Sequence, residues 1–485
     1  MERIFGLETE YATISNNPDS HVGFIFRALR RGDLVLPASL WGGVANEFKS
    51  DASREYVDNG ASAELSLAED TDFGKYPYRI YAAHVSLGRR YVAESTEPEY
   101  YSDNNKFKVS LYANVEDSAG NSWASHANYL ASRKLEEKFY IAALAVHNLS
   151  RIVWSGAGSV VWDRKAGFSY HLSERAKFIK DVIGFDTISR RALVNLRDEP
   201  LADEKRFRRI HDVSGETVFS PNVNTLRFAA TSIILRACEL GVNFFDLMPE
   251  FPVAALHSIS SDPTLRRLVV LKNGRKLSAL DLQQELAVRS LEHTLRAGYI
   301  TQQEIKWGKY WLDLIDDLKA GHLDRRSNEL DWILKQKLIE KELERNSKDQ
   351  RVTKNRFYIA QAKALHYHKL APEEGGGMRA LRAGIFPNSP SDEVFEKGVE
   401  LPQTRARLRV QAIRELIDLG LFNGADWCMV SAKDNLSPAK ALLLNDPYET
   451  DPARLKDWIK SLRGKPGSRL SRVTRSLRYK KESVA

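Results

Sequence analysis

The order of strand-like and helix-like segments constrains the fold of this chain more than any other feature. Strand-like segments bounded by turn residues occupy much of the first 260 of the 485 residues, among them "RIFGLETEYATI", "GRRYVAES" and "KFKVSLYANV". From residue 302 to residue 370 the sequence is helical in pattern and heavily charged. We therefore expect a mixed α and β fold of the α+β class, in which helices become dominant toward the carboxy terminus.

Two acidic residues alternate on the first strand-like segment. In "GLETEY", Glu8 and Glu10 share one face of the expected strand, about 7 Å apart along the backbone. Mg²⁺ binds a few protein carboxylates and leaves its other positions for water and phosphate, so this pair suits a magnesium site. Alternating acids are also typical of the solvent-exposed face of an ordinary strand, and this alternative stays open.

A second polar face is expected in "GRRYVAESTEPEYYSD", residues 88–103. As a strand, this segment points Arg89, Tyr91 and Ala93 to one side, and Glu99 follows a Thr-Glu-Pro turn. Tyr91 and Glu99 would add oxygen ligands if this strand lay beside the first one, and Arg89 would offer a planar fork to a phosphate. The methyl group of Ala93 then stands where one more carboxylate would complete the face.

Arginines and a tryptophan supply the other parts that a nucleotide site needs. The segment "NLRDEPLADEKRFRRIH" contains Arg197, Arg208 and Arg209, and "GADWCMV" contains Trp427. Cations neutralise phosphate charge, and an aromatic ring can stack on adenine. Taken singly, these residues are more typical of surface ion pairs and of a core tryptophan. Together with the carboxylates they indicate a magnesium-nucleotide site.

Composition excludes several classes of protein. The two cysteines, Cys238 and Cys428, lack metal-type spacing, and the sequence contains no disulfide framework. The amino terminus has acids where a signal peptide would be apolar, and no apolar run approaches the roughly 18 residues of a membrane helix. We expect a cytoplasmic protein without a membrane partner.

The net charge of +8 is concentrated in the last 26 residues. Residues 460–485 hold nine Lys or Arg and one Glu, so the other residues balance to neutrality. This basic tail is interpreted first as a mobile segment without a specific ligand. Docking on an acidic patch of the protein and binding of nucleic acid are the alternatives, and nucleic acid is not expected elsewhere.

A break rich in Pro and Gly, residues 370–392, indicates a domain boundary. We expect a catalytic domain over residues 1–390, a small carboxy-terminal domain over 391–459, and the basic tail over 460–485. Gly375 to Gly377 lack the Lys-Ser/Thr ending of a phosphate loop, and a Rossmann glycine pattern is absent from the sequence.

Several long motifs, in matching order, resemble those of the Pup ligase and depupylase family. They are "RIFGLETEY", "RRYVAESTEPEYYS", "DSAGNSWASHANYL", "SGAGSV", "YHLSERA", "NLRDEPLADEKRFRRIH", "LDWILKQKL", "TRARLR" and "DWCMV". The resemblance runs from residue 1 to about residue 455. It implies a fold like that of glutamine synthetase, in which a curved antiparallel sheet cradles Mg-ATP, helices pack behind it, and a small carboxy-terminal domain closes the nucleotide end.

The resemblance also implies roles for single residues. Glu8, Tyr91 and Glu99 would bind magnesium, Arg89 and Ser102 would hold ATP phosphates, and Trp427 would pack near the base. Arg197 and Arg208 or Arg209 would face the transferred phosphoryl group. The family has an aspartate two residues after the tyrosine of the strand, which ligase and depupylase both use, and here that position is Ala93. The glutamate of the family's "HEN" is likewise replaced, by Ala127.

Three functions follow from this interpretation. With the nucleotide side intact and the aspartate missing, the first hypothesis is an ATP-dependent phosphotransferase derived from a Pup ligase. It would move the γ-phosphoryl group to an anionic acceptor, a nucleotide phosphate or a small carboxylate, which needs no base. The second is Pup ligation or depupylation with a displaced base, with Pup and its protein targets as partners. The third is a nucleotide-binding regulator without catalysis.

Overall fold

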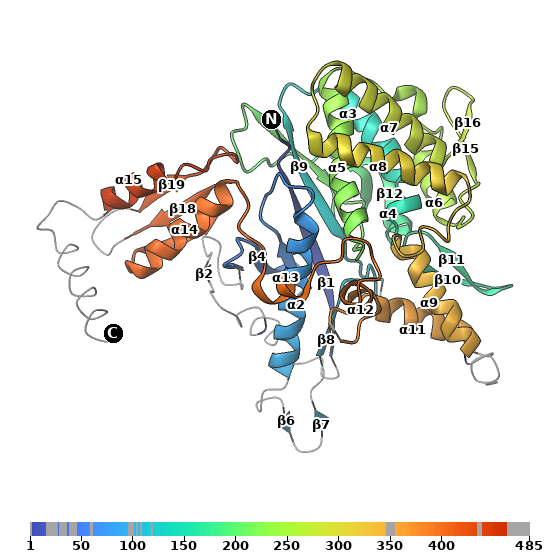
Figure 1. Ribbon diagram of the computed structural model, residues 1–485, viewed down its shortest axis with the longest axis horizontal. Helices are drawn as coiled ribbons and strands as arrows, with labels where there is room; N and C mark the ends of the chain where they lie inside the picture. The colour runs from blue at the N-terminus through green and yellow to red at the C-terminus, as the bar shows by residue number, and fades with distance from the viewer. Residues whose placement is uncertain are drawn as a thin grey trace, which may run out of the picture.

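The structure is a computed structural model of the 485-residue chain. Figure 1 shows a large body built around a sheet, with the last helices and strands projecting to one side. The residues that the structure describes are 2–15, 28, 36–37, 46–58, 62–95, 101–102, 105–106, 109–117, 120–345, 355–371, 373–433 and 439–462.

A sheet of ten strands forms the centre of the described chain. Its order is β12-β13-β14-β9-β1-β5-β4-β3-β2, with β8 also paired to β1, and every pair except β12 with β13 is antiparallel. Its strands are β1 (Phe5–Ser15), β2 (Leu36–Pro37), β3 (Asn46–Phe48), β4 (Arg54–Asp58), β5 (Ser62–Ser66), β8 (Val109–Tyr112), β9 (Ser125–Ser132), β12 (Ile179–Gly184), β13 (Arg191–Asn195) and β14 (Phe207–Asp212). The expected α+β class with a curved antiparallel sheet is confirmed.

The alternation of β1 explains how the sheet is covered. From Phe5 to Tyr11, odd-numbered residues are buried and even-numbered residues are partly exposed, as period-2 alternation requires. The buried side packs in the main core with α2 (Tyr76–Ser95) and α5 (Pro221–Glu239), where the ring of Phe5 stacks on Phe228 at 4.7 Å. The even-numbered face, which carries Glu8 and Glu10, is therefore left for polar groups.

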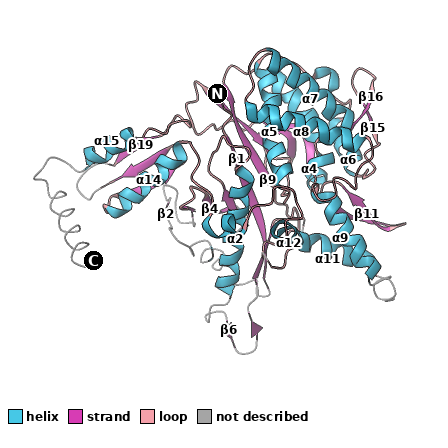
Figure 2. Cartoon of the chain, in the orientation of Figure 1, coloured by secondary structure: helices cyan, strands magenta, loops and turns pink. Residues whose placement is uncertain are grey.

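The other helices pack around this core or extend from it (Figure 2). Those of the main body are α3 (Glu137–Ser150), α4 (Ile152–Ser155), α6 (Pro252–Ser260), α7 (Ala279–Arg296), α8 (Gln302–Lys319), α9 (Asp331–Arg345), α11 (Arg356–Tyr367), α12 (Gly376–Arg382) and α13 (Asp392–Lys397), with the short turns η3 (Arg175–Phe178) and η4 (Phe245–Leu247). Three two-stranded sheets complete it: β6 (Tyr101–Ser102) with β7 (Asn105–Lys106), β10 (Ser159–Asp163) with β11 (Gly167–His171), and β15 (Leu268–Val270) with β16 (Lys276–Ser278).

The carboxy-terminal part of the described chain has an apolar cluster of its own. It joins α14 (Arg405–Asp418), β17 (Phe422–Asp426), β18 (Met429–Ala432), β19 (Lys440–Leu443) and α15 (Pro452–Leu462). Phe48 of β3 is buried in the same cluster, so this part is joined to the central sheet. The division at residue 390 stays a prediction, and residues 463–485 of the basic tail lie outside the described residues.

The expectation that residues 88–95 form a strand is wrong. They form the last two turns of the helix α2, which is drawn in cyan in Figure 2. The segment has the aromatic and aliphatic residues of a strand, but the run from Tyr76 to Ser95 repeats its buried positions at helical spacing, with Tyr76, Ile80, Leu87 and Tyr91 in the main core.

Among the described helices, none is both long and apolar enough to cross a membrane.

Candidate functional site

Two cross-strand rows of polar residues lie on the even-numbered face of the sheet. In the first row, Arg54 of β4 is opposite Ser66 of β5, Ser66 is opposite Glu8 of β1, and Glu8 is opposite His126 of β9. Residues directly opposite in neighbouring strands have Cβ atoms about 5 Å apart. Side chains from four strands, far apart in sequence, are therefore neighbours on one surface.

The second row brings another carboxylate and a phenol to the same surface. Tyr56 of β4 is opposite Glu64 of β5, which is opposite Glu10 of β1. The Tyr56 hydroxyl lies 3.3 Å from Oγ of Ser66. Burial, then the charges of Glu64 and Glu8, raise the pKa of Tyr56 well above its usual value. These oxygen atoms therefore form one strongly negative patch.

Glu8 is the centre of this patch. Its Oε2 atom lies 3.6 Å from Nδ1 of His126 and 3.6 Å from Nε2 of His211, and its Oε1 atom accepts a 3.1 Å hydrogen bond from Asn128. Burial raises the pKa of the Glu8 carboxyl, but the two imidazoles and the charge of Arg209 outweigh it and hold that pKa well below the usual range. Glu8 is thus ionised at neutral pH.

The residues around Glu8 fit a divalent cation. One ligand atom from each of Glu8, His126 and His211 can be chosen so that all three lie within 4.8 Å of one another. In the part of the chain that the structure describes, Nε2 of His126, both ring nitrogens of His211 and Oδ1 of Asn128 are buried without a hydrogen-bond partner. Burial lowers the pKa of His211 to about 4, so its imidazole is neutral and can donate a lone pair.

A cavity connects this patch to the carboxy-terminal part of the chain. Glu8, Ser66, Arg209 and Trp427 all contribute to its lining. Trp427 packs edge to face on Phe48, with ring centroids 5.4 Å apart, and the Arg54 guanidinium lies 6.0 Å from the Trp427 ring centroid. An aromatic ring, guanidinium groups and a carboxylate patch along one cavity are the parts that bind base, phosphates and metal of a nucleotide.

Three of the residues expected in the site thus lie around one cavity: Glu8, Arg209 and Trp427. Arg208, the neighbour of Arg209 on β14, is on the opposite face and donates to Glu137 and to the Tyr140 hydroxyl of α3. Arg197 is exposed in a loop and paired with Glu199 at 2.9 Å. The structure brings neither of these two arginines to Glu8.

Arg89 and Tyr91 lie on the wrong side of the sheet for a ligand set with Glu8. The Arg89 side chain is 45% exposed on α2 and pairs with Glu396 at 2.7 Å. Tyr91 is 1% exposed in the main core, and the same helix carries Ala93. Arg89 and Tyr91 were expected to contact phosphate and magnesium because a strand would place them on one face. In the helix α2 they point in different directions.

The remaining expected ligands cannot be placed at the site. Glu99 lies outside the described residues, and Ser102 belongs to the two-residue strand β6, of whose side chains nothing is described. Ala127 points to the helix-covered face of β9, since the flanking His126 and Asn128 face Glu8. The alanine at position 127, where the family has a glutamate, is therefore a buried residue of the main core.

The motif that was assigned to residues 89–99 has a second occurrence in the sequence. In both places a tyrosine follows an arginine by two residues, and a glutamate follows that tyrosine by eight. The second occurrence consists of Arg54, Tyr56 and Glu64, with Asp58 two residues after the tyrosine. This copy lies on β4 and β5 beside Glu8, and its third position is an aspartate. The replacement of the family's aspartate by Ala93 stays a prediction, but Ala93 lies on α2, whereas Asp58 lies on a strand of the sheet that carries Glu8. The equal spacing was the signal in the sequence that could have revealed this second copy of the motif.

Comparison with known proteins shows the family to which the chain belongs. The family described as Pup-ligase protein matches residues 3–431. A Pup–protein ligase of Micrococcus luteus is 30% identical over 468 residues, covering 93% of this chain and 96% of that protein. A Pup–protein ligase of Geodermatophilus obscurus is 31% identical over 480 residues, covering 95% and 99%.

Two solved structures share the fold. The complex between the prokaryotic ubiquitin-like protein Pup and its ligase PafA superposes with a TM-score of 0.80 at 23% identity, covering all of this chain and 95% of that one. The Pup ligase PafA in complex with ADP gives a TM-score of 0.73 at 23% identity, covering 87% and 91%. On the family match and the full-length relatives together, the chain belongs to the Pup-ligase protein family.

Proposed function

We propose that this protein is an ATP-dependent ligase that joins a carboxylate of Pup, or of a small protein like it, to a lysine amine of a target protein. In the first step the γ-phosphoryl group of ATP passes to the carboxylate, giving an acyl phosphate and ADP. In the second step the amine nitrogen attacks the acyl carbon, the bond to the phosphate oxygen breaks, and phosphate leaves. The protonated amine gives one proton to a base before it attacks, and its second proton leaves with the phosphate.

The observation that carries the proposal is the position of the Arg54, Tyr56, Asp58 and Glu64 motif in the sheet. A lysine amine is protonated at neutral pH, with a reference pKa of about 10.4, so its attack requires a base. Asp58 is two residues after Tyr56 on β4, and Tyr56 is opposite Glu64. We assign Asp58 the role of this base, from its place in the motif and in the strand.

The other residues of the sheet face bind and orient the nucleotide. Glu8 and Glu64, with Tyr56, His126 and His211 around them, would hold Mg²⁺ together with water and phosphate oxygens, and the ion would supply positive charge against the ATP phosphates. Arg209 and Arg54 would contact phosphate oxygens. The Trp427 ring would pack against the base at the end of the cavity.

The phosphotransferase hypothesis depended on a missing aspartate. With Asp58 in the motif, the reason to prefer an anionic acceptor is gone, and the relatives are named as Pup–protein ligases. A nucleotide-binding regulator without catalysis is disfavoured by the same set of acidic and basic groups, since a passive site needs no base.

The direct test incubates the purified protein with Mg²⁺, ATP, Pup ending in glutamate, and a lysine-containing acceptor protein. We expect a covalent Pup conjugate and ADP in equal amounts, measured by mass spectrometry and by chromatography. Label from γ-labelled ATP should appear as inorganic phosphate. Stable transfer of that label to a small carboxylate or nucleotide, without a conjugate, would contradict the proposal and restore the phosphotransferase.

A further inference from the structure

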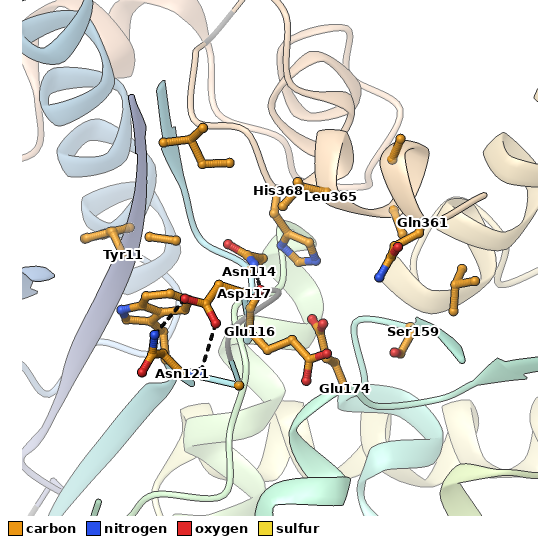
Figure 3. Close-up of a pocket in the computed structure, with 18 of the residues that line it drawn as sticks. Tyr11, Asn114, Glu116, Asp117, Asn121, Ser159, Glu174, Gln361, Leu365 and His368 are labelled. Carbon is orange, nitrogen blue, oxygen red and sulfur yellow. Dashed lines mark hydrogen bonds between the residues drawn. The ribbon is translucent and has the colours of Figure 1, made fainter. Parts of the chain in front are cut away.

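A second, larger cavity of about 1030 Å³ lies at the other end of β1 from Trp427. Ala12 of β1 and Ser62 of β5 contribute to its wall, and Ser62 is the strand partner of Asp58. The cavity therefore begins where the proposed base is placed and extends away from the nucleotide end. Figure 3 shows its polar lining, with labelled side chains from β1, the turn after β8, β10 and the helix α11, and Lys335 of α9 also contributes to the wall.

Four motifs of the family resemblance meet at this cavity. Asn121 comes from "DSAGNSW", Ser159 from "SGAGSV", Glu174 from "YHLSERA" and Lys335 from "LDWILKQKL". Segments more than two hundred residues apart thus converge on one space beside the proposed site of bond formation. That convergence calls for a ligand of the same reaction.

The charge of the lining favours a cation. Glu116, Asp117 and Glu174 line the cavity, and the Glu116 and Glu174 carboxylates point into the same part of it (Figure 3). Lys335 is also in the wall, but its Nζ atom donates to the Gly158 carbonyl at 2.8 Å and lies 2.7 Å from Nε2 of His368. Its positive charge is thus engaged inside the wall. The Glu116 carboxylate is also ion-paired with Lys177, and three carboxylates against one lysine leave the described lining acidic.

A buried acceptor atom points to the same ligand chemistry. Asn114 is only 6% exposed, and its Nδ2 donates to the Glu116 carbonyl, which fixes the orientation of the amide. Its Oδ1 has no hydrogen-bond partner within the described residues. Leaving a buried acceptor unpaired is costly, and an ammonium group offers three donors and no acceptor.

On the basis of the proposed ligase function, we propose that this cavity receives the acceptor of the reaction, a protonated lysine side chain of the target protein. Glu174 and Glu116 bind its ammonium group, and Asn114 Oδ1 accepts one of its hydrogen bonds. A carboxylate-bearing donor would be repelled by the same acids, so the donor enters elsewhere. The ammonium first loses one proton to Asp58, the neutral amine nitrogen then attacks the acyl carbon, and phosphate leaves with the second proton that the nitrogen gives up.

The experiment separates donor activation from acceptor binding in the full-length protein. Pup and Mg-ATP are supplied with either hydroxylamine, a neutral nucleophile that traps the acyl phosphate as a hydroxamate, or Nα-acetyl-lysine methylamide. The variants are Glu174→Gln and Glu116→Gln, and the matched control is Glu292→Gln, an exposed residue of α7. Thermal unfolding of each variant is recorded in parallel.

We expect Glu174→Gln to raise KM for the lysine probe by at least about tenfold, or 1.4 kcal/mol, with hydroxamate formation within about twofold of wild type. Glu116→Gln should do the same more weakly, and Glu292→Gln should change neither. If Glu174→Gln fails to fold, Glu116→Gln carries the test alone.

Unchanged KM values in the folded variants would overturn the inference, as would an equal fall in hydroxamate and ligation. Wild-type protein that forms neither product would instead refute the ligase function itself, and the acceptor cavity with it. Wild type that forms hydroxamate but never joins the lysine probe or a lysine protein would overturn the acceptor assignment alone.

Discussion

The same short pattern, arginine and tyrosine two residues apart, occurs on β4 and on α2, with opposite consequences. On β4, Arg54 and Tyr56 share the polar face of the sheet with Ser66 and Glu64. On α2, Arg89 is exposed toward Glu396, while Tyr91 is buried in the main core. Two residues along a strand return to the same side, whereas two residues along a helix turn by about 200°.

The difference teaches that a motif has chemical meaning only with its secondary structure. The segments 88–95 and 54–58 both contain a Tyr-Val pair, which favours a strand. Its neighbours decide the outcome, because α2 must cover the apolar face of β1 and Arg90 ion-pairs with Glu55 on that face. The β4 copy instead is joined by hydrogen bonds to β5 along its whole length.

The largest expected effect separates the two copies at their third position. Asp58→Asn removes the proposed base with little change in size, so ligation to lysine should fall by about 100-fold or more. Ala93→Asp, in the α2 copy, should leave the turnover of a folded protein unchanged. Both are measured as rates of Pup conjugation. Full activity of Asp58→Asn would show that the base lies elsewhere.

The next effect concerns Glu64, the proposed metal ligand of the β4 copy. Glu64→Gln keeps the shape of the side chain but removes one charge from the patch around Glu8, so the rate of hydroxamate formation with Mg-ATP should fall by about tenfold to 100-fold. Glu292→Gln, at an exposed position of α7, is the matched control, and it should have no effect on that rate. Equal losses in both variants would break the comparison.

A smaller effect is expected from the two arginines. Arg54→Lys loses the planar fork beside Trp427 and should raise KM for ATP by roughly five- to tenfold. Arg89→Lys should not change KM for ATP, because Arg89 pairs with Glu396 on the far side of the sheet. An exposed ion pair contributes about 0–1 kcal/mol, so urea unfolding should barely detect this change. A KM effect of Arg89→Lys alone would reverse the assignment of the copies.

The smallest effect is a pH dependence of protein stability that comes from Glu174 in the second cavity, which lies beside the β4 copy. Burial, opposed by Lys335 and Lys177 and assisted by Glu116 and Glu216, raises the pKa of Glu174 to about 7. A raised carboxyl pKa means that the folded state binds the proton more tightly, so its stabilising effect is full below about pH 4.5 and is lost as pH rises through 7.

Glu174→Gln should therefore stabilise the protein at pH 8 by about 1 kcal/mol after allowance for partial exposure, and change little at pH 5. The free energy of unfolding in urea at the two pH values measures this. In wild type, KM for the lysine probe should also rise as pH falls below 7, because a neutral Glu174 attracts the ammonium less. A variant less stable at pH 8 than at pH 5, relative to wild type, would contradict this sign.

The sequence by itself determined the α+β class and the polar face of β1. Alternation over "GLETEY" needs no partner to place Glu8 and Glu10 on one side, and the structure keeps them there. The sequence motifs also pointed to Arg209 and Trp427, which lie with Glu8 around one cavity. Long motifs in a fixed order were sufficient to identify the family.

Tertiary structure alone decided which copy of the motif faces Glu8. His126 and His211 join Glu8 only because β9 pairs with both β1 and β14, a contact between residues more than eighty positions apart. The second cavity likewise depends on α11 packing against both α9 and β10. Local patterns fix periodicity and exposure, whereas strand pairing and helix packing are set by long-range burial, and a site assembled from several elements exists only after that burial.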